Sequence, residues 1–469
     1  MSITEKNIDL NSLEKEIYRQ CNEYGRELLK SILSELDEKI MLERDRRVYR
    51  HKGKRKTVLK TIMGEVEYER SIYESKDENG NKNYIYLLDE ALGFESVGFI
   101  SGMLAEKIAE ASCEMSYREA AKTVSALTGQ SISHTGTWNV VQELGEKLDD
   151  KEQQAAQLAK QNRGKGKAET KLLFEEQDGV VLKLQGKDRK KLGKNAEMKI
   201  AIAYTGAKKT GKKRYNLEGK VACANFECID RFFARKEGVI AETYNIDEIE
   251  MRIVNGDGAD WIKHSITDDN VHYQLDTFHR NKAVLQHVTE PEMRKIIFNL
   301  LYSGQIEPLL RVIEGYAECT QDPKEKENYL SLLKYFQNNK AGLLSYKRRG
   351  IELPQPEVGI EYRGCGAMES NVYSIIGHRM KNRRANWSIN GGNNLARLLT
   401  LKATGRLVDV LSGLVPATLP TQYTEQVETV LSAAKVPQHI GKGYNGFSHG
   451  AILVRQKWMK YFLGLNPFC

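Results

Sequence analysis

The chain has 469 residues, with 71 Lys and Arg against 63 Asp and Glu, which gives a formal net charge of +8. Such a length predicts two to four domains. The seven cysteines contain no C-x-x-C pair, which argues against a zinc knuckle and a disulfide framework. The start lacks an apolar segment, and no run approaches the ~18 apolar residues of a spanning helix. We therefore expect a soluble, cytoplasmic protein with no membrane partner.

Residues 1–110 read as a helical and β-hairpin region with a basic arm. Apolar residues recur at helical spacing over residues 10–44 and predict a long amphipathic helix. Residues 44–60 hold nine Lys or Arg and one acidic residue, which is typical of a solvated face or flexible arm. Alternation over residues 57–73, about Met63-Gly64-Glu65, predicts a β-hairpin. A basic hairpin beside a basic arm could lie on DNA.

Residues 111–168 predict a helix-turn-helix followed by a linker. Two short helices are joined by a turn containing Gly129, and Ser133 or Thr135 is suited to cap the second helix. Similar patterns are common in all-α domains that do not bind DNA. In a helix-turn-helix the second helix enters the major groove, which would bring several polar side chains near base edges. These side chains are His134, Thr137, Asn139 and Gln142.

The remainder predicts an α/β core with a mixed sheet that is interrupted by helices. Residues 169–281 form its first part, rich in strands, and residues 282–350 are helical throughout. Residues 351–404 form the second part, in which a Gly-Cys-Gly turn leads into a helix. The role of residues 405–469 does not follow from their pattern.

Three acidic residues are candidates for a metal site. Asp178 lies within a strand in LLFEEQDGVVLKLQ, and Asp257 follows the strand RIVN. Carboxylates at neighbouring strand ends can converge on two divalent ions about 3.5–4 Å apart. Oxygen ligands favour Mg²⁺ or Mn²⁺ over zinc. Glu369 lies near a predicted helix start, where a glutamate also suits the helix dipole, so its spacing alone does not distinguish it.

Each of these acids has a plainer interpretation, because a single aspartate is more often a turn or cap residue. Nearby acids compete as secondary ligands, namely Glu175, Glu176 and Asp260. No fragment has the spacing of a P-loop, so we expect no nucleotide cofactor.

Four motifs carry a family resemblance. They are D-G-V in a strand, G-D-G-A-x-W-I, D-T-F-H-R-N, and E-S-N-V-x-S-x-x-x-x-R-M-K-x-R-x-x-x-W-S. They resemble the bacterial insertion-sequence transposases of the ISLre type and, more distantly, the Mutator-like DDE superfamily. The similarity covers nearly the whole chain and is most specific over residues 364–398.

This resemblance implies a ribonuclease H-like core in which Asp178, Asp257 and Glu369 surround paired Mg²⁺ or Mn²⁺ ions. The helical block at residues 282–350 matches the insertion that separates the second Asp from the Glu in that superfamily. Asp276 and His279 match its C/D-x-x-H signature, which implies an auxiliary role near the active site. A lone His after a strand is otherwise more often structural.

The implied activity is metal-dependent cleavage and strand transfer of double-stranded DNA, at terminal inverted repeats and at a target. Two transposon ends must be held together, so a homodimer or higher oligomer, associated with the nucleoid, is expected. The alternatives are a domesticated metal-dependent nuclease and a non-enzymatic DNA-binding regulator.

A basic cluster after Glu369 is a candidate for holding DNA phosphates, and its plainer interpretation is a solvent-facing helix end. The cluster consists of Arg379, Lys381, Arg383 and Arg384. Trp387 could stack on a splayed base, although a tryptophan is more often a core residue.

Overall fold

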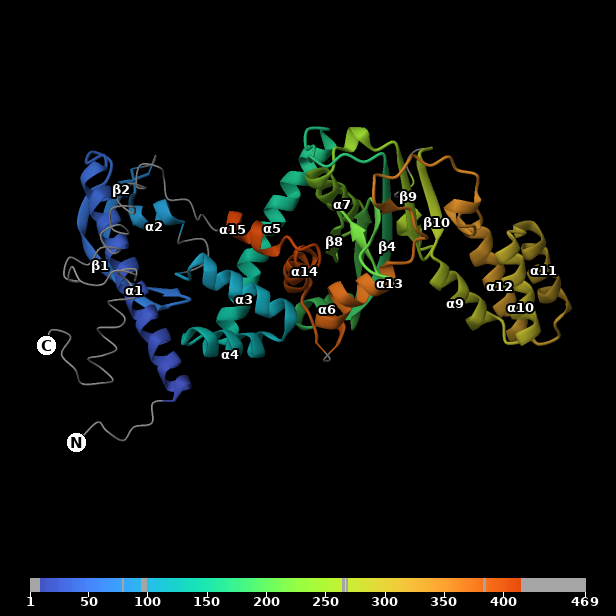
Figure 1. Ribbon diagram of the computed structural model, residues 1–469, viewed down its shortest axis with the longest axis horizontal. Helices are drawn as coiled ribbons and strands as arrows, with labels where there is room; N and C mark the ends of the chain where they lie inside the picture. Colours follow the sequence, from blue (N-terminus) through green and yellow to red (C-terminus); the bar gives the residue numbers. More distant parts are fainter. Residues whose placement is uncertain are drawn as a thin grey trace. The chain divides into compact units, whose positions relative to one another are not determined.

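The computed structural model describes residues 9–77, 80–93, 99–263, 266, 269–382 and 385–414 (Figure 1). The chain divides into two compact units. The first comprises Met1–Glu143 with Val408–Cys469, and the second comprises Leu144–Leu407. Among the described residues, none of the helices has both the length and the hydropathy needed to cross a membrane.

The first unit is built on the long helix α1 (Leu10–Glu43), which confirms the amphipathic helix predicted there. Asp9 caps it by accepting a hydrogen bond from Ser12 N. Leu33, Leu36 and Ile40 lie on one side of α1 and are buried against the strands that follow. These strands are β1 (Arg50–Thr61), β2 (Gly64–Lys76) and β3 (Lys82–Ile85), and α2 (Leu87–Leu92) completes the layer.

β1 and β2 form the predicted hairpin, which begins earlier than expected. The basic run is therefore mostly strand β1 and not a flexible arm. Several of its lysines face glutamates across the hairpin, with Nζ to Oε distances of 2.8 Å for Lys52–Glu74 and 3.5 Å for Lys56–Glu67. Cross-strand pairing of opposite charges favours the strand and offsets part of the positive charge that suggested a DNA-binding arm.

Three helices follow, namely α3 (Gly102–Glu114), α4 (Tyr117–Thr128) and α5 (His134–Lys160). Gly129 ends α4 with a φ of 68°, a conformation that favours glycine. Ser133 Oγ accepts a hydrogen bond from Gly136 N at 3.0 Å, so Ser133 is the cap expected at the start of α5. The turn is as predicted, but α5 is far longer than the short helix expected.

The second unit contains a five-stranded sheet in the order β10-β9-β4-β5-β8. The strands are β4 (Leu172–Lys183), β5 (Asn195–Tyr204), β8 (Val221–Asn225), β9 (Met251–Gly256) and β10 (Val271–Leu275). β4, β5 and β8 are antiparallel in succession, whereas β9 and β10 run parallel to β4. This confirms an α/β core with a mixed sheet.

Buried polar contacts hold helices to this sheet. Helix α7 (Ile229–Thr243) packs against β8 and β5 and carries Arg235, which bonds the Glu227 carboxylate at 3.0 Å. Arg397, on α14 (Ile389–Ala403), bonds Glu152 of α5 at 3.1 Å. These bonds explain why α5 continues into charged residues that the sequence assigns to a linker.

A helical block follows α9 (Thr277–His287), as predicted. It consists of α10 (Pro291–Ser303), α11 (Ile306–Cys319) and α12 (Pro323–Asn338), which pack in succession (Figure 1). The chain then enters α13 (Met368–Asn371), which continues as the π-helix η5 (Val372–Lys381).

The remaining elements are short. They are α6 (Gly186–Leu192), β6 (Gly206–Lys209), β7 (Tyr215–Glu218), η2 (Ile246–Glu248), α8 (Asp260–Lys263), η3 (Lys340–Gly342), η4 (Tyr346–Arg348), β11 (Ile360–Glu361) and α15 (Leu407–Leu414).

Asp37 provides a test of the first unit. Its carboxylate is fully buried and accepts hydrogen bonds of 2.8 Å from both the backbone N and Oγ of Ser71 on β2. Asp37→Ala leaves these buried donors without their acceptor, so we expect about 2–3 kcal/mol less stability against local opening. Hydrogen exchange of β2 amides measures this loss. Glu38→Ala, on the exposed neighbouring residue, should change it by less than about 0.5 kcal/mol, and equal effects would contradict the assignment.

Candidate metal centre

Strand register brings three aspartates to one level of the sheet. Gln177 of β4 is paired with Gly256 of β9, which is paired with Leu275 of β10. The residue after each of these is an aspartate, so Asp178, Asp257 and Asp276 follow the same row across three parallel strands. Ligand sites in α/β sheets commonly lie at the carboxyl ends of parallel strands.

Asp178 meets two distant residues at this level. Potential ligand atoms of Asp178, His279 and Glu369 all lie within 4.8 Å of one another. They come from β4, from the first turn of α9 and from the first turn of α13. Two carboxylates and an imidazole from separate elements form a donor set suited to a divalent cation.

Asp257 lies near this group but is not a member of it among the described residues. Its Oδ1 accepts a hydrogen bond of 2.9 Å from Ala259 N, and its backbone oxygen accepts one of 2.6 Å from the Tyr335 hydroxyl. Its charge acts on both Asp178 and His279 and raises the pKa of each. That Asp257 shares the metal with Asp178 and Glu369 stays a prediction.

Asp276 orients His279. As the cap of α9, its Oδ1 accepts from His279 N at 3.0 Å and lies 3.2 Å from His279 Nδ1. A carboxylate bonded to one imidazole nitrogen fixes the ring and leaves the other nitrogen for a ligand, as in many metal sites. Asp276 and His279, the pair that the resemblance implies, are thus hydrogen-bonded to each other. His279 is also one of the three residues whose potential ligand atoms lie within 4.8 Å of one another.

Burial and charge shift the pKa values at this site. Burial, helped by the negative charges of Asp257 and Glu369, raises the pKa of Asp178 to about 6. The hydrogen bond to Asp276 raises the pKa of His279. Burial acts to raise the pKa of Asp276, but hydrogen bonds from His279 and Asn255 outweigh it and lower that pKa. Asp178 therefore has an environment that disfavours its charge, whereas Asp276 has one that favours it.

The neighbouring acids named as competing ligands have other partners. Glu175 points to the opposite face from Glu176, where its carboxylate pairs with Lys236 and lies 3.0 Å from Arg252 Nη1. Glu176 accepts hydrogen bonds within the second unit, and Asp260 is exposed. None of the three belongs to the group around Asp178.

Two residues predicted to read DNA bases are buried in the first unit. Thr137 is 0 % exposed and donates a hydrogen bond to Ser133 O at 3.1 Å, and Gln142 is also buried. This corrects the prediction, because neither side chain can reach a base edge in this fold. His134 and Asn139 are exposed as expected. Trp138, which the sequence pattern does not single out, is 44 % exposed on the same helix.

The basic cluster after Glu369 is only partly on the surface. Arg379 is buried, and its guanidinium lies 5.3 Å from the ring centroid of Trp387. Trp387 is itself buried and donates from Nε1 to Met380 O at 2.9 Å, so the stacking role is wrong and the core interpretation holds. Lys381 is exposed. Arg383 and Arg384 lie outside the described residues.

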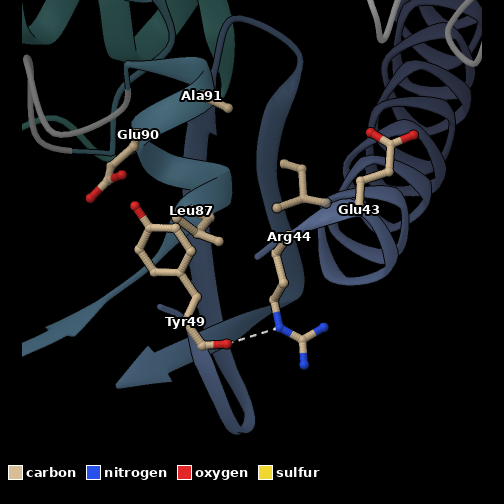
Figure 2. Close-up of a pocket in the computed structure, with 7 residues that line it drawn as sticks. Glu43, Arg44, Tyr49, Leu87, Glu90 and Ala91 are labelled. Carbon is tan, nitrogen blue, oxygen red and sulfur yellow. Dashed lines mark hydrogen bonds between the residues drawn. The ribbon is translucent and has the colours of Figure 1, made fainter. Parts of the chain in front are cut away.

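A separate pocket of about 390 Å³ lies in the first unit between the end of α1 and α2 (Figure 2). Arg44 Nε donates to Tyr49 O at 3.1 Å within it. Glu43 and Glu90 lie on opposite sides of this pocket in Figure 2, so their carboxylates do not converge on one ion.

Comparison with known proteins places the chain in a family. Residues 3–410 match a family described as an uncharacterised protein family (UPF0236). A UPF0236 protein of Caldanaerobacter subterraneus subsp. tengcongensis is 24% identical over 405 residues, which cover 85% of this chain and 80% of that protein. The UPF0236 protein in the vanSb 3' region of Streptococcus gallolyticus is 23% identical over 469 residues, with 96% of each chain covered. The chain is therefore a member of the UPF0236 family.

Proposed function

We propose that this protein is a DDE transposase of the ISLre type that binds the terminal repeats of its own element and cleaves and joins DNA. The observation that carries the proposal is the convergence of Asp178, His279 and Glu369, whose ligand atoms lie within 4.8 Å although the chain separates them widely. Asp178 is buried, His279 is partly buried and Glu369 is exposed, so the group lies where a buried strand meets the surface.

The order of the sheet supports the same proposal. Three antiparallel strands followed by two strands parallel to the first form a mixed sheet, which is compatible with the ribonuclease H-like core that the resemblance implies. The helices α10 to α12 fall between Asp257 and Glu369, where the superfamily carries its insertion.

The relatives add an independent argument. One Caldanaerobacter relative carries eleven locus labels in its name, and another carries four. A gene found at many loci of one genome is what an element that copies and inserts itself would leave. This favours transposition over a nuclease with a single cellular role.

Asp178 and Glu369, with Asp257 beside them, would supply the oxygen ligands that Mg²⁺ or Mn²⁺ prefers, and His279 would add one nitrogen donor. When bound, such an ion would activate a water or a DNA 3′-hydroxyl as the nucleophile and would stabilise charge on the phosphodiester. The protein's own contribution is to hold these side chains on rigid elements before DNA arrives. Asp276 fixes the imidazole of His279, so that a ring nitrogen is presented to the site.

Substitution of the acids tests the activity. Full-length protein with Mn²⁺ should nick and join a duplex that carries the repeats flanking its gene. Asp178→Asn, Asp257→Asn and Glu369→Gln should each lower the rate at least about a thousandfold, because several kcal/mol of charge stabilisation is lost, while DNA affinity stays unchanged. Gel assays of cleavage and joining measure this.

Asp260→Asn is the matched control, because Asp260 lies three residues beyond Asp257 and its side chain is exposed. Full activity of the Asp257 variant would remove that residue from the site. Cleavage without joining would favour a domesticated nuclease, and DNA binding without any cleavage would favour a regulator.

The raised pKa of Asp178 predicts how metal binding depends on pH. Its folded-state pKa of about 6 lies above the ordinary 3.8. The protonated carboxyl therefore stabilises the metal-free fold, an effect complete below about 3.8 and lost as pH rises through about 6. Because a metal needs the ionised form, Mn²⁺ affinity should fall as pH is lowered below 6, by up to about tenfold per pH unit from this group, and the raised pKa of His279 should add to the fall.

Calorimetric titration with Mn²⁺ at pH 5.5 and 7.5 checks this dependence, with circular dichroism to verify that the fold is intact at both values. An affinity that is the same at both pH values would contradict the assignment of Asp178 as a ligand.

A further inference from the structure

The Glu176 side chain accepts five hydrogen bonds from described residues of the second unit. It is completely buried on β4, two residues before Asp178 and on the same face of the strand. Its oxygens accept hydrogen bonds from the Tyr204 hydroxyl at 2.6 Å and from Asn255 Nδ2 at 3.1 Å. They also accept three bonds from the backbone N–H groups of residues 366–368, at 2.9, 3.1 and 3.1 Å.

The three backbone donors lie immediately before Glu369. They belong to the turn that starts α13, whose cap residue, Ala367, has no polar side chain. The first N–H groups of a helix need acceptors from outside it. Glu176 supplies them from a strand 190 residues earlier in the chain and so fixes where α13 begins. The position of the Glu369 carboxylate follows from that start.

The same carboxylate is linked to the other distant ligand. Asn255 Nδ2 donates both to Glu176 Oε2 and, at 3.0 Å, to Asp276 Oδ2. Asp276 in turn holds His279 through its Oδ1. A continuous hydrogen-bonded chain therefore runs from Glu176 through Asn255 and Asp276 to His279.

We propose that Glu176 is a positioning residue that aligns Glu369 and His279 with Asp178 around a divalent metal, without binding the metal itself. It is not among the residues whose ligand atoms gather at the site. The inference rests on the proposed metal-dependent function. It adds that the geometry of the centre is set by one buried carboxyl group, which bonds both the α13 turn and the Asn255–Asp276 pair.

A glutamine cannot accept the same set of hydrogen bonds as Glu176, although it has nearly the same shape. Oε1 accepts from Ala367 N and Tyr204, whereas Oε2 accepts from Gly366 N, Met368 N and Asn255. Whichever oxygen becomes an NH₂ group, at least one backbone N–H then faces a donor. The turn must shift, and Glu369 shifts with it.

The experiment compares Glu176→Gln with Glu175→Gln in the full chain. Glu175 is the adjacent residue, is equally buried and points to the opposite face, toward Lys236 and Arg252. Glu176→Gln should weaken Mn²⁺ binding by about 10–100-fold, as loss of a partner behind metal ligands does. It should also lower kcat with little change in KM for DNA and speed hydrogen exchange at residues 366–381. Glu175→Gln should lower thermal stability and leave Mn²⁺ affinity within about twofold.

Tyr204→Phe removes one hydrogen-bond donor to Glu176 and keeps the packing. This second variant tests the inference even if Glu176→Gln does not fold. It should weaken Mn²⁺ binding several-fold with the fold intact. Wild-type protein that binds Mn²⁺ and cleaves DNA, with Glu176→Gln and Tyr204→Phe behaving identically to it, would overturn this inference alone. Wild-type protein that binds no Mn²⁺ would overturn the proposed function instead.

Discussion

The second unit is constrained by the convergence of acidic side chains at one end of a buried sheet. A carboxylate in such a place is costly unless donors or cations surround it. Glu176 and Asp276 are supplied with donors by neighbouring elements, and Glu175 by Lys236. Burial raises the pKa of both Glu176 and Asp178, but Asp178 also faces the negative charges of Asp257 and Glu369. A divalent cation would offset that repulsion, so the surroundings of Asp178 favour a bound ion.

The side chains of strand β4 alternate between two faces, one that carries a structural ion pair and one that carries the candidate metal site. Successive side chains of a strand point to opposite faces. Glu175 therefore joins the cations of α7 and β9 on one face, while Glu176 and Asp178 meet α13 and α9 on the other. Removing one partner of a buried ion pair is strongly destabilising, which ties the first face to folding. The second face is where a change in bonding alters the positions of the candidate ligands.

Much of the fold follows from local patterns. Periodicity identifies α1, the hairpin and the helices α10 to α12, and turn chemistry identifies Gly129 and Ser133. The errors arise where tertiary contacts decide. The lysines of β1 suggest a flexible arm from sequence alone, because the glutamates that face them across the hairpin are not evident there. Helix α5 continues beyond its apolar pattern because Arg397 bonds Glu152. Helical phase relative to the core also decides which face of α5 is exposed, and Thr137 falls on the buried side.

The candidate site shows the same limit more sharply. The sequence alone places Asp178 within one strand and Asp257 directly after another, and the pairing of β4 with β9 brings them to one level. Nothing local distinguishes Glu369 from other glutamates, and only the family resemblance singles it out. Glu176 looks like one more acid in a strand, since the backbone donors that it holds at α13 lie 190 residues or more away. What selects Glu369 is a helix start that needs acceptors, and the residue that supplies them is visible only when β4 and α13 are brought together.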